Sequence, residues 1–269
     1  MNYFRTAIPA CAAILLACNV SAQSSFSTSG LDGEPRSGQA TNGDGIVLTQ
    51  NTDPTTIIPA NSVSCSAMNL HADNSYLRRF DLDGEFALGE PITVDSVDIG
   101  VETATSGTGG DQPISIIVHS IANADAFTFG NLVEIGRLDT LVADATQTIV
   151  NFPVSSTAIN PASDDLVVEV FTPNGQDVGH SFFIGSNAAG QTNPTFLSAP
   201  DCNLDEPAPT GDIGFPDMHM VMSVLASVGG APPPPPPEAT SVPTLSRTGL
   251  GIMLLIMALV GIVAVRRGS

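Results

Sequence analysis

The sequence predicts an all-β protein with a single β-sandwich or jelly-roll domain over residues 61–228, between two apolar terminal segments. Short runs rich in Val, Ile and Phe recur along this range, and clusters of Gly, Pro, Asn and Asp separate them. No window outside the terminal segments keeps a helical period. The expected strands are 80–82, 92–101, 114–121, 132–138, 148–154, 166–171, 180–184 and 217–225. Short strands at this spacing are typical of a sandwich or jelly roll.

Residues 1–22 are expected to form a signal peptide. Arg5 precedes an apolar stretch at 7–17, and Val20-Ser21-Ala22 supplies the small residues that precede a cleavage site. The chain is therefore expected to be exported. The segment Leu15-Leu16-Ala17-Cys18 resembles a bacterial lipobox and offers the alternative that Cys18 is lipidated. Cleavage after Ala22 is favoured, because Leu16 fits the lipobox poorly and a lipid would duplicate a C-terminal anchor.

Two segments beside the domain have the composition of linkers. Residues 23–60 are rich in Ser, Thr, Gly, Asp and Asn and are expected to be a flexible lead-in with at most one strand, at Ile46-Val47-Leu48. Residues 229–241 contain Gly-Gly-Ala followed by the proline run 232–237. Such a run favours a polyproline II stalk that rises about 3.1 Å per residue.

The four cysteines predict one disulfide in the domain. Cys11 and Cys18 lie in the signal region, so only Cys65 and Cys202 remain in the exported body. An exported chain meets an oxidising compartment, where such a pair should form a bond that stabilises the fold by roughly 4 kcal/mol. Metal binding and redox catalysis are disfavoured because no Cys-x-x-Cys spacing is present.

The charge of the chain excludes one class of partner. All 27 acidic residues lie between Asp32 and Glu238, and lysine is absent from the chain. The basic residues in that region are Arg36, Arg78, Arg79 and Arg137, so its net charge is about −23. A surface of this sign repels phosphate backbones, so we expect no nucleic-acid binding. It suits a soluble extracellular protein.

The C-terminal end predicts a membrane segment. An uncharged apolar run over 249–265 is followed by Arg266-Arg267. As a helix it would rise roughly 25 Å at about 1.5 Å per residue, close to the minimum for spanning a bilayer core. The two arginines favour the cytoplasmic side, which would place the domain across the membrane from the cytosol.

A short motif precedes this segment, and it consists of Val242, Pro243, Thr244, Leu245 and Ser246. With the apolar run and the arginine end, residues 242–269 resemble the IPTL-CTERM sorting domain of Gram-negative bacteria. The family usually has Ile where this chain has Val242, and Trp-Gly where it has Thr248-Gly249. The resemblance implies that an exosortase-like transpeptidase in the membrane recognises the motif, so that these are substrate residues. A plain membrane anchor is the alternative.

Two weak candidate sites lie in the domain. Asp81, Asp83 and Glu85 surround Gly84, and oxygen-rich clusters of this kind suit a structural calcium ion, although strand alternation alone would also place them on a solvated face. The cofactor that the sequence suggests is therefore a structural calcium ion.

The last expected strand alternates between two faces. Met218, Met220 and Met222 share one face, which we expect to be core, and Asp217 and His219 share the other. The latter two could form a metal-binding or acid/base pair, or a solvated ion pair.

No catalytic residues are assigned, because the four histidines are scattered and residues 185–190 do not match a nucleophile elbow. Two hypotheses of different class remain. The first is a non-enzymatic protein of the cell surface or extracellular matrix, anchored in the membrane at least transiently and then sorted. The second is a calcium-assisted carbohydrate-binding module, or a hydrolase-derived domain, held in exopolysaccharide. The absence of tryptophan and the presence of only two tyrosines weaken the second.

Overall fold

The computed structural model describes residues 25–27, 41–42 and 45–229. The expected signal peptide, the sorting motif at 242–246 and the apolar run at 249–265 lie outside these ranges, as does most of the expected stalk. The chain divides into two units between Pro232 and Pro233, and every described residue belongs to the first. No helix within the described ranges is long and apolar enough to cross a membrane.

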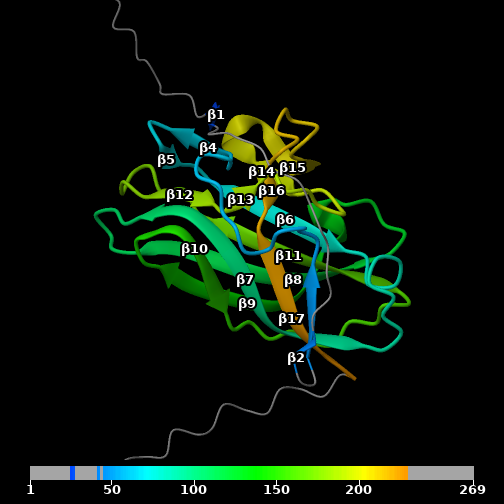
Figure 1. Ribbon diagram of the computed structural model, residues 1–269. Helices are drawn as coiled ribbons and strands as arrows, with labels where there is room; N and C mark the ends of the chain where they lie inside the picture. The colour runs from blue at the N-terminus through cyan, green and yellow to red at the C-terminus, as the bar shows by residue number, and fades with distance from the viewer. Residues whose placement is uncertain (1–24, 28–40, 43–44, 230–269) are drawn as a thin grey trace, which may run out of the picture. The chain divides into compact units, whose positions relative to one another are not determined.

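The described residues form an all-β fold built on two six-stranded antiparallel sheets (Figure 1). The first sheet has the order β10 (Ala145–Phe152), β7 (Ile92–Thr105), β17 (Met222–Val228), β3 (Gly45–Thr49) and β2 (Thr41–Asn42), and β12 (Ser181–Ile184) also pairs with β7. The second has the order β15 (Leu204–Pro209), β14 (Phe196–Ala199), β6 (Asn74–Phe80), β11 (Asp164–Thr172), β8 (Gln112–Ala122) and β9 (Val133–Val142). The predicted β-sandwich is confirmed.

Smaller elements complete the described part of the fold. A three-stranded sheet has the order β1 (Ser25–Ser27), β4 (Ser64–Ala67) and β5 (Leu70–His71), and β13 (Ser186–Asn187) pairs with β16 (His219–Met220). Two single-turn 3-10 helices, η1 (Phe129–Asn131) and η2 (Pro200–Cys202), are the helical elements of the described residues.

Period-two alternation places the core between the two large sheets. Along β11, Leu166, Val168 and Val170 are fully buried in the main hydrophobic cluster, whereas Asp165 and Glu169 lie on the opposite face. The methionine face behaves as expected, since Met218, Met220 and Met222 are at most 2% exposed and belong to the same cluster. Burial of these apolar side chains is the main force that holds the sheets together.

The structure has more strands at its N-terminal side than the sequence predicts. Residues 23–60 contain β1, β2 and β3, where at most one strand was expected. β3 pairs with β17 from Gly45↔Ser227 to Thr49↔Ser223, and its Ile46 and Leu48 enter the main core. β3 contains the strand expected at residues 46–48, whereas β1 and β2 are the additional ones.

The second sheet differs from expectation along β6. The sequence predicts a strand over residues 80–82. The structure instead has β6 over Asn74–Phe80, followed by turns at residues 82–86. The pattern was missed because β6 carries Arg78 at a core position, which breaks the apolar alternation. The strands β14 and β15 were also not predicted.

The predicted disulfide is present between Cys65 of β4 and Cys202 of η2, with an S–S distance of 2.07 Å and a Cα–Cα distance of 6.0 Å. Both sulfur atoms lie in a small hydrophobic cluster with Ala72 and Ala199. The bond joins segments that are 137 residues apart in sequence. It therefore ties the three-stranded sheet to the far edge of the second large sheet.

Candidate functional site

The three carboxylates considered for calcium do not converge on one point. Asp81 and Asp83 are exposed in the turn after β6, where Asp81 Oδ1 accepts a hydrogen bond from the Gly84 amide at 2.7 Å. Glu85 points toward the protein instead. Its Oε2 accepts hydrogen bonds of 2.7 Å from Gln50 Nε2 and from Asn193 Nδ2, and its Oε1 accepts one from Thr192.

Because residues 82–86 turn rather than extend, the alternation that would align these carboxylates does not apply. No group of three or more His, Cys, Asp and Glu side chains in the described part of the chain is arranged to hold a metal ion.

Asp217 and His219 also have separate surroundings. Asp217 is exposed, whereas His219 is only 9% exposed and uses both ring nitrogens for backbone contacts. Its Nδ1 accepts from the Gly190 amide at 2.9 Å, and its Nε2 donates to the Pro216 carbonyl oxygen at 3.1 Å. Burial lowers the pKa of His219, which favours this neutral form. The geometry therefore holds a loop in place and leaves neither ring nitrogen free for acid/base chemistry.

Two of the buried histidines, His71 and His219, predict a loss of stability in mild acid. Burial lowers the pKa of each below the ordinary value of 6.5. Below that value the unfolded chain binds protons that the folded chain does not, so the free energy of unfolding should fall as the pH decreases from about 7 to about 5. Urea unfolding at several pH values measures this slope. Replacing His71 with Gln should reduce it, and a stability that stays constant or rises toward about pH 5 would contradict the prediction.

Arg78 is a buried cation that the sequence did not single out as part of a site. Its side chain is fully buried, and burial lowers its pKa to about 9, which leaves it protonated at neutral pH. Its Nε donates to the Met220 carbonyl oxygen at 3.1 Å, and Nη1 donates to Asn193 O and Gln50 Oε1 at 3.2 and 3.3 Å. Gln50 in turn donates to Glu85, so the cation and the nearest carboxylate are joined through an amide.

Three buried polar side chains of the second sheet, outside its main hydrophobic core, form a cluster that resembles a catalytic triad only in composition. Glu169 of β11 accepts hydrogen bonds from Ser75 Oγ of β6 at 2.5 Å and from His119 Nε2 of β8 at 2.9 Å. The carboxylate therefore lies between the hydroxyl and the imidazole. A serine nucleophile needs direct contact with the base, so this order does not activate Ser75. No sequence motif predicts the cluster, because each residue comes from a different strand.

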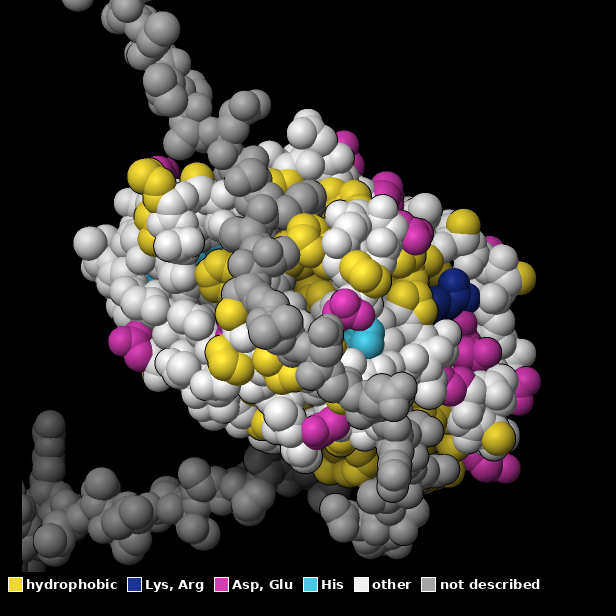
Figure 2. Space-filling model, turned by 45° about the horizontal axis from the view of Figure 1, so that its top comes forward, with side chains coloured by type: hydrophobic (Ala, Val, Ile, Leu, Met, Phe, Trp, Pro, Cys, Tyr) yellow, Lys and Arg dark blue, Asp and Glu magenta, His cyan; other side chains and the backbone are white. Residues whose placement is uncertain are grey.

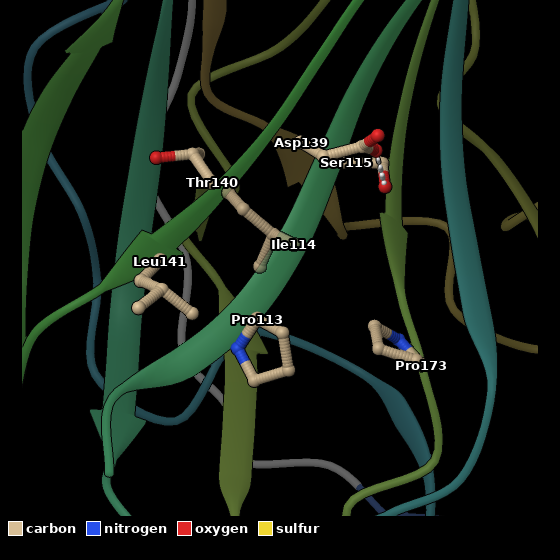
Figure 3. A pocket seen from close by; sticks show the side chains of 7 residues that line it. All are labelled: Pro113, Ile114, Ser115, Asp139, Thr140, Leu141 and Pro173. Carbon is tan, nitrogen blue, oxygen red and sulfur yellow. Dashed lines mark hydrogen bonds between the residues drawn. The ribbon is translucent and has the colours of Figure 1, made fainter.

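A shallow hollow of about 410 Å³ lies over β8 and β9 (Figure 3). Its apolar lining includes Pro113, Leu141 and Pro173. At one end Ser115 Oγ donates to Asp139 Oδ1 at 2.6 Å, and Arg137 donates to both side chains at 3.2 and 2.8 Å. These hydrogen bonds lower the pKa of Asp139. Because Ser115, Asp139 and Arg137 form hydrogen bonds with one another, this hollow offers a ligand mostly apolar contacts.

A second hollow, of about 290 Å³, lies where β6 and β11 meet the loops at residues 123 and 193. Arg79 Nε donates to Asp165 Oδ2 at 2.7 Å, and the guanidinium also donates to the carbonyl oxygens of Asp125 and Asn123 at 2.9 and 3.0 Å. Burial raises the pKa of Asp165, while Arg79 and the nearby Leu82 amide oppose that rise. Asp165 Oδ1 is buried and forms no hydrogen bond of regular geometry in the described structure, although the Leu82 amide lies near the carboxylate.

The surface carries the charge imbalance expected from the sequence. On the face shown in Figure 2, acidic side chains are spread over the surface and basic side chains occupy a small patch. Of the arginines in the described ranges, Arg78 is buried, and Arg79 and Arg137 each form ion pairs with carboxylates. The described surface therefore offers little positive charge to an anionic partner.

These features define a class of protein: an acidic β-sandwich with one disulfide and open hollows on its surface. A match to a known family lies near the C-terminal end of the chain, where residues 240–267 match the family model of the IPTL-CTERM motif. The predicted resemblance is confirmed, and it identifies the chain as an exported protein sorted to the cell surface. A comparison with curated proteins gives no match.

Two similar solved structures come from clostridial proteins. One contains the cysteine protease and lectin-like domains of Cwp84, a surface layer associated protein of Clostridium difficile, with 7% identity and a TM-score of 0.46. The other is a variant of clostridial cysteine protease Cwp84 after propeptide cleavage, with 8% identity and a TM-score of 0.47. Each match covers 70% of this chain but only 37% and 41% of the respective clostridial chain. At this identity the likeness concerns the fold alone.

Proposed function

We propose that this protein is a non-enzymatic β-sandwich of the cell surface or extracellular matrix and a substrate of an exosortase-like transpeptidase. The match of residues 240–267 to the IPTL-CTERM motif is the observation that carries this proposal. The motif residues Val242 to Ser246 would be recognised by the enzyme. The apolar run at 249–265 and Arg266-Arg267 would hold the chain in the membrane of a Gram-negative host until processing.

The sandwich has the properties that a displayed domain needs. A disulfide between Cys65 and Cys202 suits an oxidising compartment outside the cytosol. The high acidic content keeps the domain soluble at a crowded surface. The proline run at 232–237 would act as a spacer between the domain and the membrane. Cleavage near Thr244 would break one peptide bond, release the apolar tail and leave the new carboxyl end for transfer to an amine or to water.

Replacing Pro243 with Ala should prevent processing. Proline fixes its backbone φ and removes an amide donor, so a protease pocket that selects proline at this position should bind alanine more weakly. We expect the native protein from its host to end near Thr244, and the variant to keep residues 246–269. Intact-mass spectrometry of both proteins measures the difference.

A matched control is Pro237→Ala, which changes the last proline of the spacer and leaves the motif intact. The control should be processed like the native protein. A native protein that retains its whole C-terminal tail would contradict the proposal and indicate a permanent membrane anchor. The same spectrum, with and without reduction, reports the N-terminal cut and any lipid on Cys18.

A further inference from the structure

We propose that the hollow beside Arg79 binds one ring of a neutral sugar within a polysaccharide. This inference goes beyond surface sorting, which depends on the C-terminal motif and not on the sandwich. The hollow is formed by segments that are far apart in sequence. Arg79 lies in β6 and Asp81 directly after it, Asp165 is the second residue of β11, and Phe196 is the first residue of β14, with Asn193 in the loop before it.

One residue that lines the hollow, Asp165, carries a poorly satisfied acceptor. Its side chain is only 6% exposed, and its Oδ2 is held by Arg79 at 2.7 Å. Its Oδ1 forms no hydrogen bond of regular geometry with the described residues, although the Leu82 amide lies nearby. A buried acceptor without a good donor is unfavourable, so a ligand hydroxyl that donates to this carboxylate gains stabilisation.

The lining of the hollow has spare hydrogen-bond acceptors and few spare donors. The guanidinium of Arg79 is committed to Asp165 and to backbone carbonyl oxygens. Asn123 Nδ2 donates to Pro161 O at 3.1 Å, and Asn193 Nδ2 donates to Glu85 at 2.7 Å. The free groups are therefore carboxylate and amide oxygens. A ligand rich in hydroxyl donors suits this set, whereas an anion does not.

The lining of the hollow is already held in place by contacts within the protein. Arg78 donates to the Asn193 carbonyl oxygen at 3.2 Å while Glu85 accepts from the Asn193 side chain, so this loop is fixed at two points. Phe196 packs edge-to-face against Phe127 with 4.5 Å between ring centroids. A preformed site avoids the entropy cost of ordering side chains when the ligand binds.

The size and chemistry of the hollow favour a sugar over a metal ion. A volume of about 290 Å³ lies at the lower end of the range for small-molecule pockets and suits a single ring. Pro194 and Phe196 supply an apolar wall for the carbon-bound hydrogens of that ring. Calcium needs six to eight oxygen ligands, and no three acidic, His or Cys side chains of the described residues converge here. The adjacent guanidinium also opposes a cation.

The experiment measures the binding of methyl glucoside, methyl galactoside and methyl mannoside to the full chain in a detergent without sugar headgroups. Saturation-transfer NMR should show binding of at least one probe, with a dissociation constant on the order of millimolar. Asp81→Ala and Asp165→Asn should each weaken binding about tenfold or more. Asp83→Ala is the matched control, because Asp83 is an exposed carboxylate of the same turn that does not line the hollow.

Each outcome decides the proposal. Loss of binding in Asp81→Ala and Asp165→Asn, with Asp83→Ala unchanged and no effect of EDTA, supports a direct sugar site. If Asp165→Asn does not fold, Asp81→Ala alone decides. No binding of any probe at about 50 mM, or equal loss in the Asp83→Ala control, would overturn it. Binding of calcium alone that depends on Asp81 would replace it with a metal site. None of these results depends on C-terminal processing.

Discussion

Replacing Cys65 and Cys202 with Ser is expected to lower the free energy of unfolding by up to about 5 kcal/mol. The bond closes a loop between residues 137 positions apart, and the chain-entropy model assigns a loop of this length about 5 kcal/mol. Most globular domains are stable by only about 5–15 kcal/mol, so the reduced protein should be close to unfolding at physiological temperature. Denaturant unfolding with and without reductant measures the change.

Either single replacement should have nearly the same effect as the double one, because each removes the same covalent bond. The double variant should also become insensitive to reductant, which serves as the internal control. A native protein whose unfolding midpoint does not shift on full reduction would contradict the prediction. Such a result would mean that the small cluster around Ala72 and Ala199 holds η2 against β4 without the bond.

Replacing Arg78 with Ala is expected to destabilise the fold by about 3–5 kcal/mol. The substitution empties a fully buried site and removes the donors for the Met220 and Asn193 carbonyl oxygens and for Gln50. Removing one partner of a buried polar network costs much more than the network contributes net, because the remaining groups stay buried and unpaired. Urea unfolding monitored by circular dichroism measures the loss.

Arg137→Ala is the matched control for this prediction. Arg137 pairs with Glu134 and Asp139 at the surface, and its side chain is 39% exposed. Surface ion pairs typically contribute about 0–1 kcal/mol, so this variant should remain close to the native protein. Arg78→Met keeps most of the side-chain volume and should still lose stability. If it were as stable as the native protein, the hydrogen bonds of Arg78 would contribute nothing and the prediction would be wrong.

The sequence alone determined the fold class, because alternation is a local property. Residues two positions apart lie on one face of a regular strand, so the core face of the last expected strand, with Met218, Met220 and Met222, could be assigned from spacing. The pairing of Cys65 with Cys202 followed from elimination of the two cysteines in the signal region. The C-terminal motif was recognisable for the same reason, since its five residues are consecutive.

The candidate sites could be predicted only in small part. The sequence grouped Asp81 with Asp83 and Glu85 as calcium ligands, but these neighbours in sequence diverge in the turn. Asp81 shares a hollow with Arg79, Asp165 and Asn193. Asp165 and Asn193 come from segments that are distant from Asp81 in sequence. Their proximity depends on strand order, which no local pattern specifies.

Two features were decided by the tertiary structure alone. A polar side chain such as Arg78 can occupy a core position only when partners from other segments satisfy it, here Gln50, Asn193 and Met220. The sequence places a strand at residues 46–48, but the pairing of β3 with β17 depends on the tertiary structure. The sequence therefore determined which residues share a face and where the chain is sent, since both are encoded in adjacent residues. The fold decided which distant groups meet, since that depends on long-range pairing and on the need to satisfy every buried polar atom.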